Sequence, residues 1–138
     1  EDKVKIRFTL GEVLDLAYVF RQIVMHPDYD GSDGRVRSTI YATLITAAQD
    51  KGCSYISDRR VPKPGWYGPP NVDYSQVIEL EFKTEHLGAA ELIARNLSFL
   101  HREKDPDQSK ELLVVANRMN ATLTAEGYAF HSGRGWVK

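Results

Sequence analysis

Cysteine is nearly absent from this 138-residue chain, and no long apolar run occurs in it. The single cysteine, Cys53, excludes an internal disulfide and a cysteine-rich zinc site, and it favours a reducing compartment. Because no apolar run approaches the roughly 20 residues that span a bilayer, the sequence predicts a soluble protein that does not cross a membrane. No signal-peptide pattern is visible, and we therefore expect a cytoplasmic protein.

An excess of charge of one sign is also lacking. The 18 basic and 19 acidic residues give a formal net charge of −1, so the chain as a whole has no attraction for nucleic acid or for an anionic membrane. Nucleic acid is therefore not favoured as a partner, and any attraction for phosphate has to be local. With 42% hydrophobic and 27% charged residues, the composition predicts one globular domain over residues 1–138.

Two kinds of hydrophobic periodicity divide the chain into strands and helices. Alternation of apolar and polar residues over 3–10 and 77–83 predicts half-buried strands, and shorter strands are predicted at 53–57 and 128–130. Apolar residues at helical spacing predict four helices, over 12–25, 38–49, 85–102 and 108–125. The β-branched content of 38–49 also fits a strand.

The helix boundaries carry cap signals. Thr9 or Gly11 is expected to cap the first helix, and Asp105 or Asp107 the last. The sequence shows no internal repeat. The order β-α-α-β-β-α-α-β predicts an α+β fold in which a small mixed or antiparallel sheet is packed by about four helices. The last two helices are predicted to form a hairpin, and burial of part of it in a homodimer suits so small a chain.

The stretch 58–73, DRRVPKPGWYGPPNVD, differs from the rest of the chain in composition. It holds four of the six prolines, two adjacent arginines and an adjacent Trp-Tyr pair. Proline fixes φ and removes donors from a strand ladder, so the stretch predicts a long, stiff loop without helix or central strand. Long loops that carry arginine and aromatic residues on a rigid scaffold are frequent binding surfaces.

A second segment of the same character, HSGRGW, lies near the end of the chain. Guanidinium groups can hold an oxyanion, and aromatic rings offer flat faces for stacking. If the two segments converge, they form an aromatic and cationic pocket for a nucleotide-like anion. In the alternative, the aromatic pair folds the loop onto the sheet as a lid and the arginines are solvated. The predicted ligand-binding residues are Arg59, Arg60, Trp66, Tyr67, His131, Arg134 and Trp136.

Glu81-Phe82-Lys83 ends a predicted strand and is followed by a predicted helix. This arrangement resembles the PD-(D/E)xK nucleases. The resemblance implies a Mg²⁺ site at Glu81 and Asp58, with Lys83 orienting the attacking water. The paired Pro-Asp signature is absent because Ser57 precedes Asp58, and alternation also fits Glu81 and Lys83 to a solvated strand face.

The acidic segment DYDGSDGR suggests a calcium loop at first sight. The EF-hand register fails, because Asp33 stands where glycine is required and Thr39 stands at the twelfth position instead of glutamate. A turn in which aspartate side chains bond to the backbone is the better interpretation. The four histidines show no spacing typical of metal ligands, so neither metal nor cofactor is predicted.

The leading functional hypothesis is a non-enzymatic binding module. It would recognise a small anionic, nucleotide-like ligand or a partner protein through the proline-rich loop and the C-terminal segment. One alternative is the Mg²⁺-dependent nuclease that uses Asp58, Glu81 and Lys83. The other is a structural or interaction subunit without a small ligand.

Overall fold

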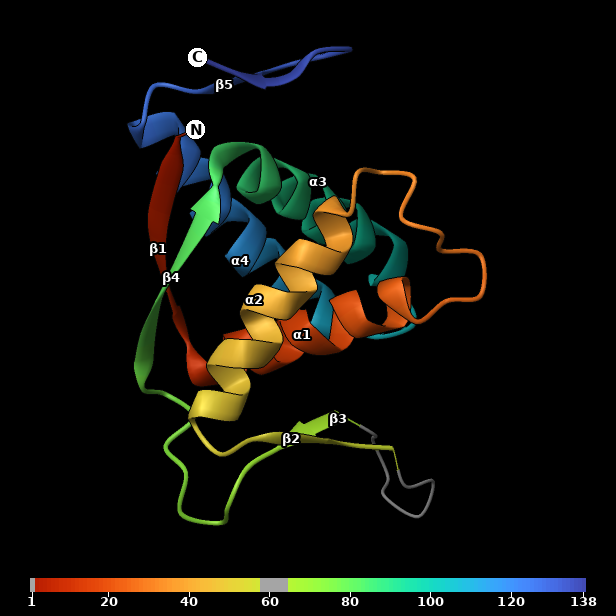
Figure 1. Cartoon of the computed structure of the whole chain (residues 1–138), viewed down its shortest axis with the longest axis vertical. Helices are drawn as coiled ribbons and strands as arrows, with labels where there is room; N and C mark the ends of the chain where they lie inside the picture. The colour runs from red at the N-terminus through yellow and green to blue at the C-terminus, as the bar shows by residue number, and fades with distance from the viewer. Residues whose placement is uncertain (1, 58–64) are drawn as a thin grey trace. The chain divides into compact units, whose positions relative to one another are not determined.

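The computed structural model describes residues 2–57 and 65–138, and it has the α+β fold that the sequence predicts (Figure 1). Its elements follow the order strand, helix, helix, strand, strand, and this order occurs twice. The first repeat comprises β1 (Lys3–Thr9), α1 (Leu10–Val24), α2 (Val36–Asp50), β2 (Ser54–Ile56) and β3 (Gly65–Tyr67). The second comprises β4 (Val77–Lys83), α3 (Thr84–His101), α4 (Pro106–Ala125), β5 (Ala129–His131) and β6 (Gly135–Val137).

The strands form small two-stranded sheets. β1 pairs with β4, and each repeat ends in an antiparallel hairpin, β2 with β3 and β5 with β6. Each of the described helices is too short or too polar to cross a bilayer.

A constant shift along the chain relates the starts of the two repeats. It takes Leu10, the first residue of α1, to Thr84, the first residue of α3, and both helices follow directly on a seven-residue strand. The hydrogen bonds at these positions are also equivalent. The Leu10 amide donates to the Gln76 carbonyl oxygen at 2.9 Å, and the Thr84 amide donates to the Asp2 carbonyl oxygen at 3.1 Å.

The ends of the second helices repeat as well. Gly52 follows α2 with φ +81°, and Gly127 follows α4 with φ +91°, the left-handed conformation that commonly ends a helix. The next amide, of Cys53 or of Tyr128, donates to a carbonyl oxygen in the last turn of its helix at 3.0 Å in both repeats. The order of elements and these hydrogen bonds therefore recur in the structure, although the sequence shows no internal repeat. Most residues at equivalent positions differ, as Leu10 and Thr84 do, so the repeat does not show as shared residues.

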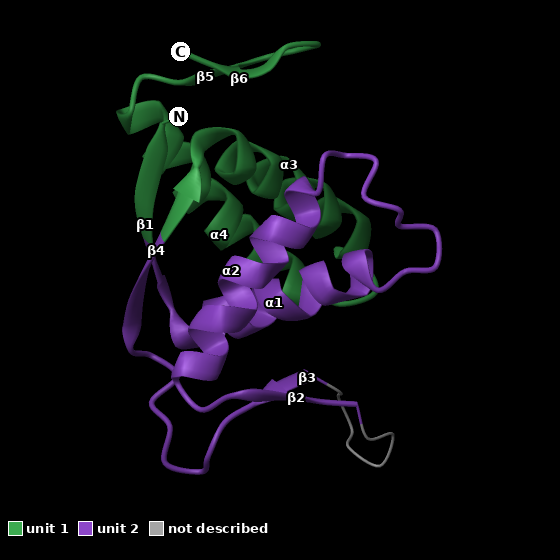
Figure 2. Cartoon of the chain, viewed as in Figure 1, with its two compact units in different colours: residues 1–6, 81–138 green, residues 7–80 purple. Residues whose placement is uncertain are grey.

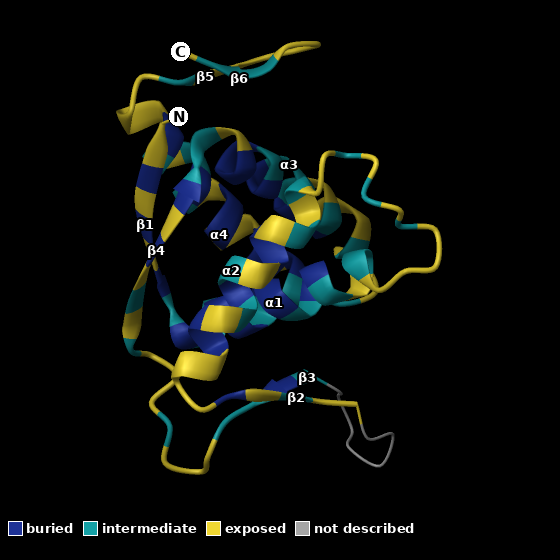
Figure 3. Cartoon of the chain, in the orientation of Figure 1, coloured by how far each residue is buried: buried dark blue, intermediate teal, exposed yellow. Residues whose placement is uncertain are grey.

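The chain divides into two compact units, residues 1–6 with 81–138 and residues 7–80, called here the 81–138 unit and the 7–80 unit (Figure 2). Both β1 and β4 change unit along their length. The start of β1, with the buried residues Val4 and Ile6, belongs with α3 and α4. Buried and exposed residues alternate along β1 (Figure 3). The start of β4, with buried Leu80, belongs with α1 and α2. The single domain expected over 1–138 stays a prediction.

Thr9 caps the helix of the 7–80 unit that it precedes, as the sequence predicts. The Glu12 amide donates to Thr9 Oγ1 at 3.2 Å, and the Thr9 amide donates to Glu12 Oε1 at 2.8 Å. This reciprocal pair is a capping box, which satisfies two backbone donors at the helix start. The buried residues that follow it on α1 are Leu10, Val13, Leu14, Leu16, Ala17, Val19 and Phe20.

The hairpin of α3 and α4 in the 81–138 unit also agrees with the sequence prediction. Asp105 caps α4 by accepting a bond from the Gln108 amide at 3.1 Å, and Pro106 is the first helical residue, where its missing N–H costs nothing. Ser98 and Ser109 join the two helices, because each hydroxyl donates to the other residue's carbonyl oxygen at 2.6 Å.

Most predicted boundaries differ from the structure by one or two residues, and two strands were not predicted. Residues 65–67, expected in a loop, form β3, because two-stranded pairing leaves an open edge that tolerates nearby prolines. The tail holds a second strand, β6, in addition to the predicted one. Helix α2 begins at Val36 rather than at residue 38, since the side-chain carboxylate of Asp33 in the turn before it accepts a hydrogen bond from the Arg37 amide at 3.2 Å.

Candidate functional site

The predicted ligand-binding residues belong to different parts of the structure. Trp66 and Tyr67 lie in β3 of the 7–80 unit. The C-terminal residues, His131, Arg134 and Trp136, lie in the β5–β6 hairpin of the 81–138 unit. Arg59 and Arg60 lie outside the described residues. A pocket shared by both segments therefore stays a prediction.

Trp66 belongs to an aromatic cluster centred on Tyr55 in the 7–80 unit. Tyr55 stands opposite Trp66 in the β2–β3 ladder, and their ring centroids lie 5.7 Å apart with an interplanar angle of 64°. The ring of Tyr18, on α1, stacks against Tyr55 with centroids 6.4 Å apart. The guanidinium carbon of Arg21 lies 4.1 Å from the Tyr55 centroid, in cation–π contact. We call Tyr18, Arg21, Tyr41, Tyr55 and Trp66 the Tyr55 cluster.

Arg21 is a partly buried cation whose partners in residues 2–57 and 65–138 are neutral groups. Its Nη1 donates to the Tyr41 hydroxyl at 3.0 Å, and its planar face lies over Tyr55. Among the described residues it has no carboxylate partner. A guanidinium has five N–H donors, so most of its hydrogen-bonding capacity is left for another acceptor. Free N–H groups of a guanidinium can donate to a carboxylate or phosphate oxygen.

The indole N–H of Trp66 is a second donor without an acceptor. Trp66 is 7% exposed, and its Nε1 is buried with no hydrogen-bond partner in the described structure. A buried donor left unpaired costs about 1–3 kcal/mol, and this cost falls when an acceptor binds beside it. Trp66 and Arg21 both lie against Tyr55, so the two donors belong to one cluster.

The second repeat has an equivalent hairpin. Trp136 stands opposite Phe130, and their rings meet at 5.8 Å and 64°, nearly the same geometry as Trp66 and Tyr55. The Nε1 of Trp136 is also buried and without a partner among the described residues. The two tryptophans therefore occupy corresponding places in the two repeats.

The arginines of the two repeats differ in their partners. The shift that takes Leu10 to Thr84 takes Arg21 to Arg95. The Nε of Arg95 donates to Glu91 Oε1 at 3.0 Å, and Glu91 is 2% exposed. The second repeat thus neutralises its arginine with a buried carboxylate, whereas the described part of the first repeat supplies none to Arg21.

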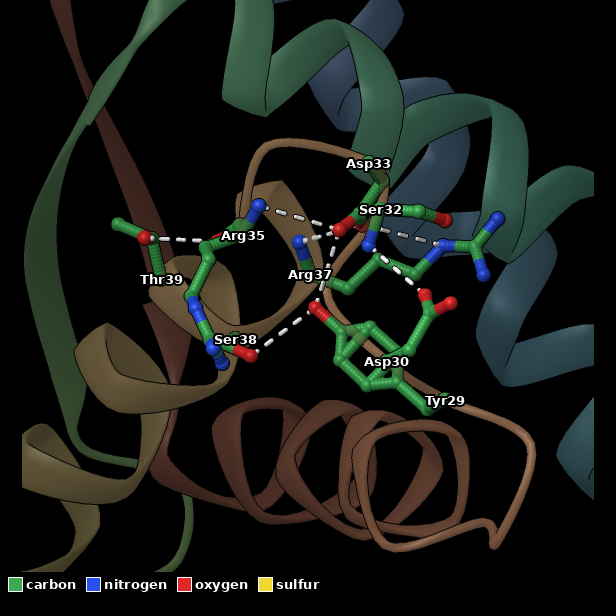
Figure 4. A network of polar contacts seen from close by, with 8 residues as sticks. All are labelled: Tyr29, Asp30, Ser32, Asp33, Arg35, Arg37, Ser38 and Thr39. Carbon is green, nitrogen blue, oxygen red and sulfur yellow. Dashed lines mark hydrogen bonds and ion pairs between the residues drawn. The ribbon is translucent and has the colours of Figure 1, made fainter.

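The polar turn before α2 is the kind of turn that the sequence predicts (Figure 4). Asp33 accepts bonds from the amides of Arg35 and Arg37 at 3.1 and 3.2 Å and from the Tyr29 hydroxyl at 3.1 Å. Burial alone would raise the pKa of Asp33, but these donors and the Arg37 charge together hold it below its usual value. Nearby, the amide and hydroxyl of Ser32 lower the pKa of Asp30.

The nuclease hypothesis is not tested by this structure. Glu81 is exposed and Lys83 is partly buried at the end of β4, while Asp58 lies outside the described residues. In residues 2–57 and 65–138, no group of three or more His, Cys, Asp or Glu side chains could hold a metal ion.

The C-terminal hairpin presents its predicted residues in different ways. His131 and Arg134 are exposed at the turn, where the Arg134 amide donates to the His131 carbonyl oxygen at 3.0 Å. Trp136 instead lies against Gly88 of α3. His131 and Arg134 are therefore exposed, whereas Trp136 is partly buried.

Sequence reasoning missed Tyr18, Arg21, Tyr41 and Tyr55. A signal for two of them exists, because Tyr18 and Arg21 are three positions apart and share a face of α1. The contact of Tyr55 with Trp66 depends on the β2–β3 register, which composition does not indicate. Comparison of the chain with protein-family models, with curated proteins and with solved structures found no match.

Proposed function

We propose that the protein is a non-enzymatic binding module for a small organic anion, and that the Tyr55 cluster holds this anion. The supporting observation is the contrast between Arg21, which has only neutral partners among the described residues, and Arg95, which a buried carboxylate neutralises. A partly buried cation without an opposite charge is costly, and an anionic ligand removes that cost.

The chemistry of the cluster favours recognition over catalysis. Arg21 and Trp66 offer N–H donors, and the tyrosines offer ring faces for a flat group such as a nucleotide base. None of the five side chains is a carboxylate, imidazole or thiol, the usual acids, bases and nucleophiles.

Native mass spectrometry of protein freshly purified from cells tests the proposal. We expect the wild-type protein to retain a small anion and Arg21→Gln to lose it. Arg102→Gln is the matched control, because Arg102 also lies over an aromatic ring, Phe99, at 4.2 Å but belongs to the 81–138 unit.

Thermal unfolding of the same variants separates binding from stability. The proposal expects Arg21→Gln to unfold close to the wild-type temperature once the anion has been removed from both by dialysis. If instead the variant unfolds far below the anion-free wild type, Arg21 serves to fix the hairpin on α1 and the proposal is wrong.

A further inference from the structure

Comparison of the two repeats indicates which anionic group the proposed site binds. This inference rests on the proposed function. Arg95 and Arg21 stand at equivalent positions on α3 and α1, each followed by its own helix and hairpin. The second repeat therefore shows which group satisfies an arginine at this place in the fold.

In the second repeat that group is a carboxylate. Glu91 stands one turn before Arg95 and accepts its Nε–H at 3.0 Å, a charge-assisted hydrogen bond. The other oxygen of Glu91 accepts from Asn120 Nδ2 at 3.3 Å, and Arg95 Nη2 donates to Asn117 Oδ1 at 3.1 Å. A planar carboxylate thus meets a guanidinium on one oxygen and an amide N–H on the other.

In the first repeat the same shift replaces Glu91 by Ala17, a residue without polar atoms in its side chain. Arg21 instead bonds to the neutral hydroxyl of Tyr41. The first repeat therefore keeps the arginine, as Arg21, but has no glutamate at the position equivalent to Glu91.

We propose that the ligand supplies this carboxylate, and that its carboxylate meets Arg21 as Glu91 meets Arg95. Tyr55 lies against Arg21, and the rings of Tyr18 and Trp66 contact Tyr55, so flat aromatic side chains are close to the arginine. The ligand class is therefore a carboxylate attached to a flat ring, rather than a phosphate ester.

Two-dimensional NMR of the ¹⁵N-labelled full chain tests the inference. The chain has two tryptophans, so it gives two indole N–H signals, and Trp66→Phe identifies the one from the cluster. Three probes share one ring and differ in its substituent: benzoate, phenyl phosphate and the neutral isostere benzamide. Each is titrated at constant ionic strength, maintained with sodium chloride.

We expect benzoate to move the Trp66 signal with an affinity about tenfold or more above that of benzamide, the difference that one charge-assisted pair supplies. Arg21→Gln should abolish this preference. Arg95→Gln should keep it, because the equivalent arginine already has its carboxylate. If Arg95→Gln does not fold, Arg102→Gln provides the same control from an exposed arginine of the 81–138 unit.

The two proposals fail in different ways. Tighter binding of phenyl phosphate than of benzoate would show that the ligand group is not a carboxylate, and the proposal of an anion site at Arg21 would still hold. Equal shifts with benzoate and benzamide, or no shift with any probe, would overturn the anion site itself.

Discussion

The indole ring of Trp136 lies directly against the backbone of Gly88: a Cβ added to Gly88 would lie 2.5 Å from Trp136 Cδ1 and 3.1 Å from Cγ. Gly88 is buried inside α3, where glycine costs about 1 kcal/mol relative to alanine. The close approach of the ring explains why this position lacks a side chain. The β5–β6 hairpin therefore depends on glycine at position 88.

Gly88→Ala should accordingly displace Trp136 and loosen the C-terminal hairpin. We expect a net loss of about 1–3 kcal/mol, because the overlap outweighs the gain in helix propensity. Chemical denaturation and the tryptophan emission spectrum measure the effect. In a Trp136→Ala background the same substitution should become stabilising by about 1 kcal/mol, and stabilisation of the wild type would contradict the packing seen here.

Thr9→Ala should remove the capping box of α1. The Glu12 amide loses its acceptor, and the expected cost is about 0.5–2 kcal/mol in the free energy of unfolding. Thr46→Ala is the control, since Thr46 is exposed in the interior of α2 and should change stability by no more than about 0.5 kcal/mol. Equal losses from both variants would argue against the cap.

Asp33 should make stability depend on acid pH. Its pKa is lower in the folded protein than its ordinary value of 3.8, so its contribution is complete above that value and is lost as the pH falls through the folded-state pKa. Asp33→Ala should cost about 1 kcal/mol at neutral pH, and the difference from wild type should shrink below about pH 4. Urea titrations at several pH values test this. A difference that stays constant down to pH 2 would show that the carboxylate charge has no part in it.

Cys53 should react slowly in the folded protein. It is 2% exposed, and burial raises the pKa of its thiol above the ordinary value of 9.0, so the reactive thiolate is scarce at neutral pH. Labelling with a maleimide at pH 7.5 should be at least tenfold slower than in urea-unfolded protein. Rapid labelling of the native chain would place the thiol at the surface.

The elements that could be predicted from the sequence are those in which a hydrophobic pattern recurs over many residues. The four helices repeat their apolar positions over several turns, and the caps at Thr9 and Asp105 are local signals. Strands β3 and β6 are as short as the predicted β2 and β5, but β3 lies in a proline-rich stretch and β6 begins at the second of two glycines in the C-terminal segment. Whether these strands pair depends on the tertiary fold, and the neighbouring prolines and glycines favour a loop prediction.

The candidate site was predictable only in part. Trp66 stood out by composition, but Arg21 looks like any helical arginine until its neighbours are known. Its significance comes from what surrounds it, two tyrosines and no described carboxylate, and from the contrast with Arg95. The contrast between the two arginines becomes apparent only when the two repeats are compared. The repeat is recognised from the order of elements and from equivalent hydrogen bonds, and not from identical residues.

Because β1 and β4 each belong partly to one unit and partly to the other, a cut between the two repeats would divide both units. A cut near Asn71 would separate the buried Val4 and Ile6 from α3 and α4, and it would separate Leu80 from α1 and α2. Neither fragment would then contain all the residues of a hydrophobic core. The two pieces should behave as a split protein, unfolded when expressed singly and reconstituted by fragment complementation when expressed together.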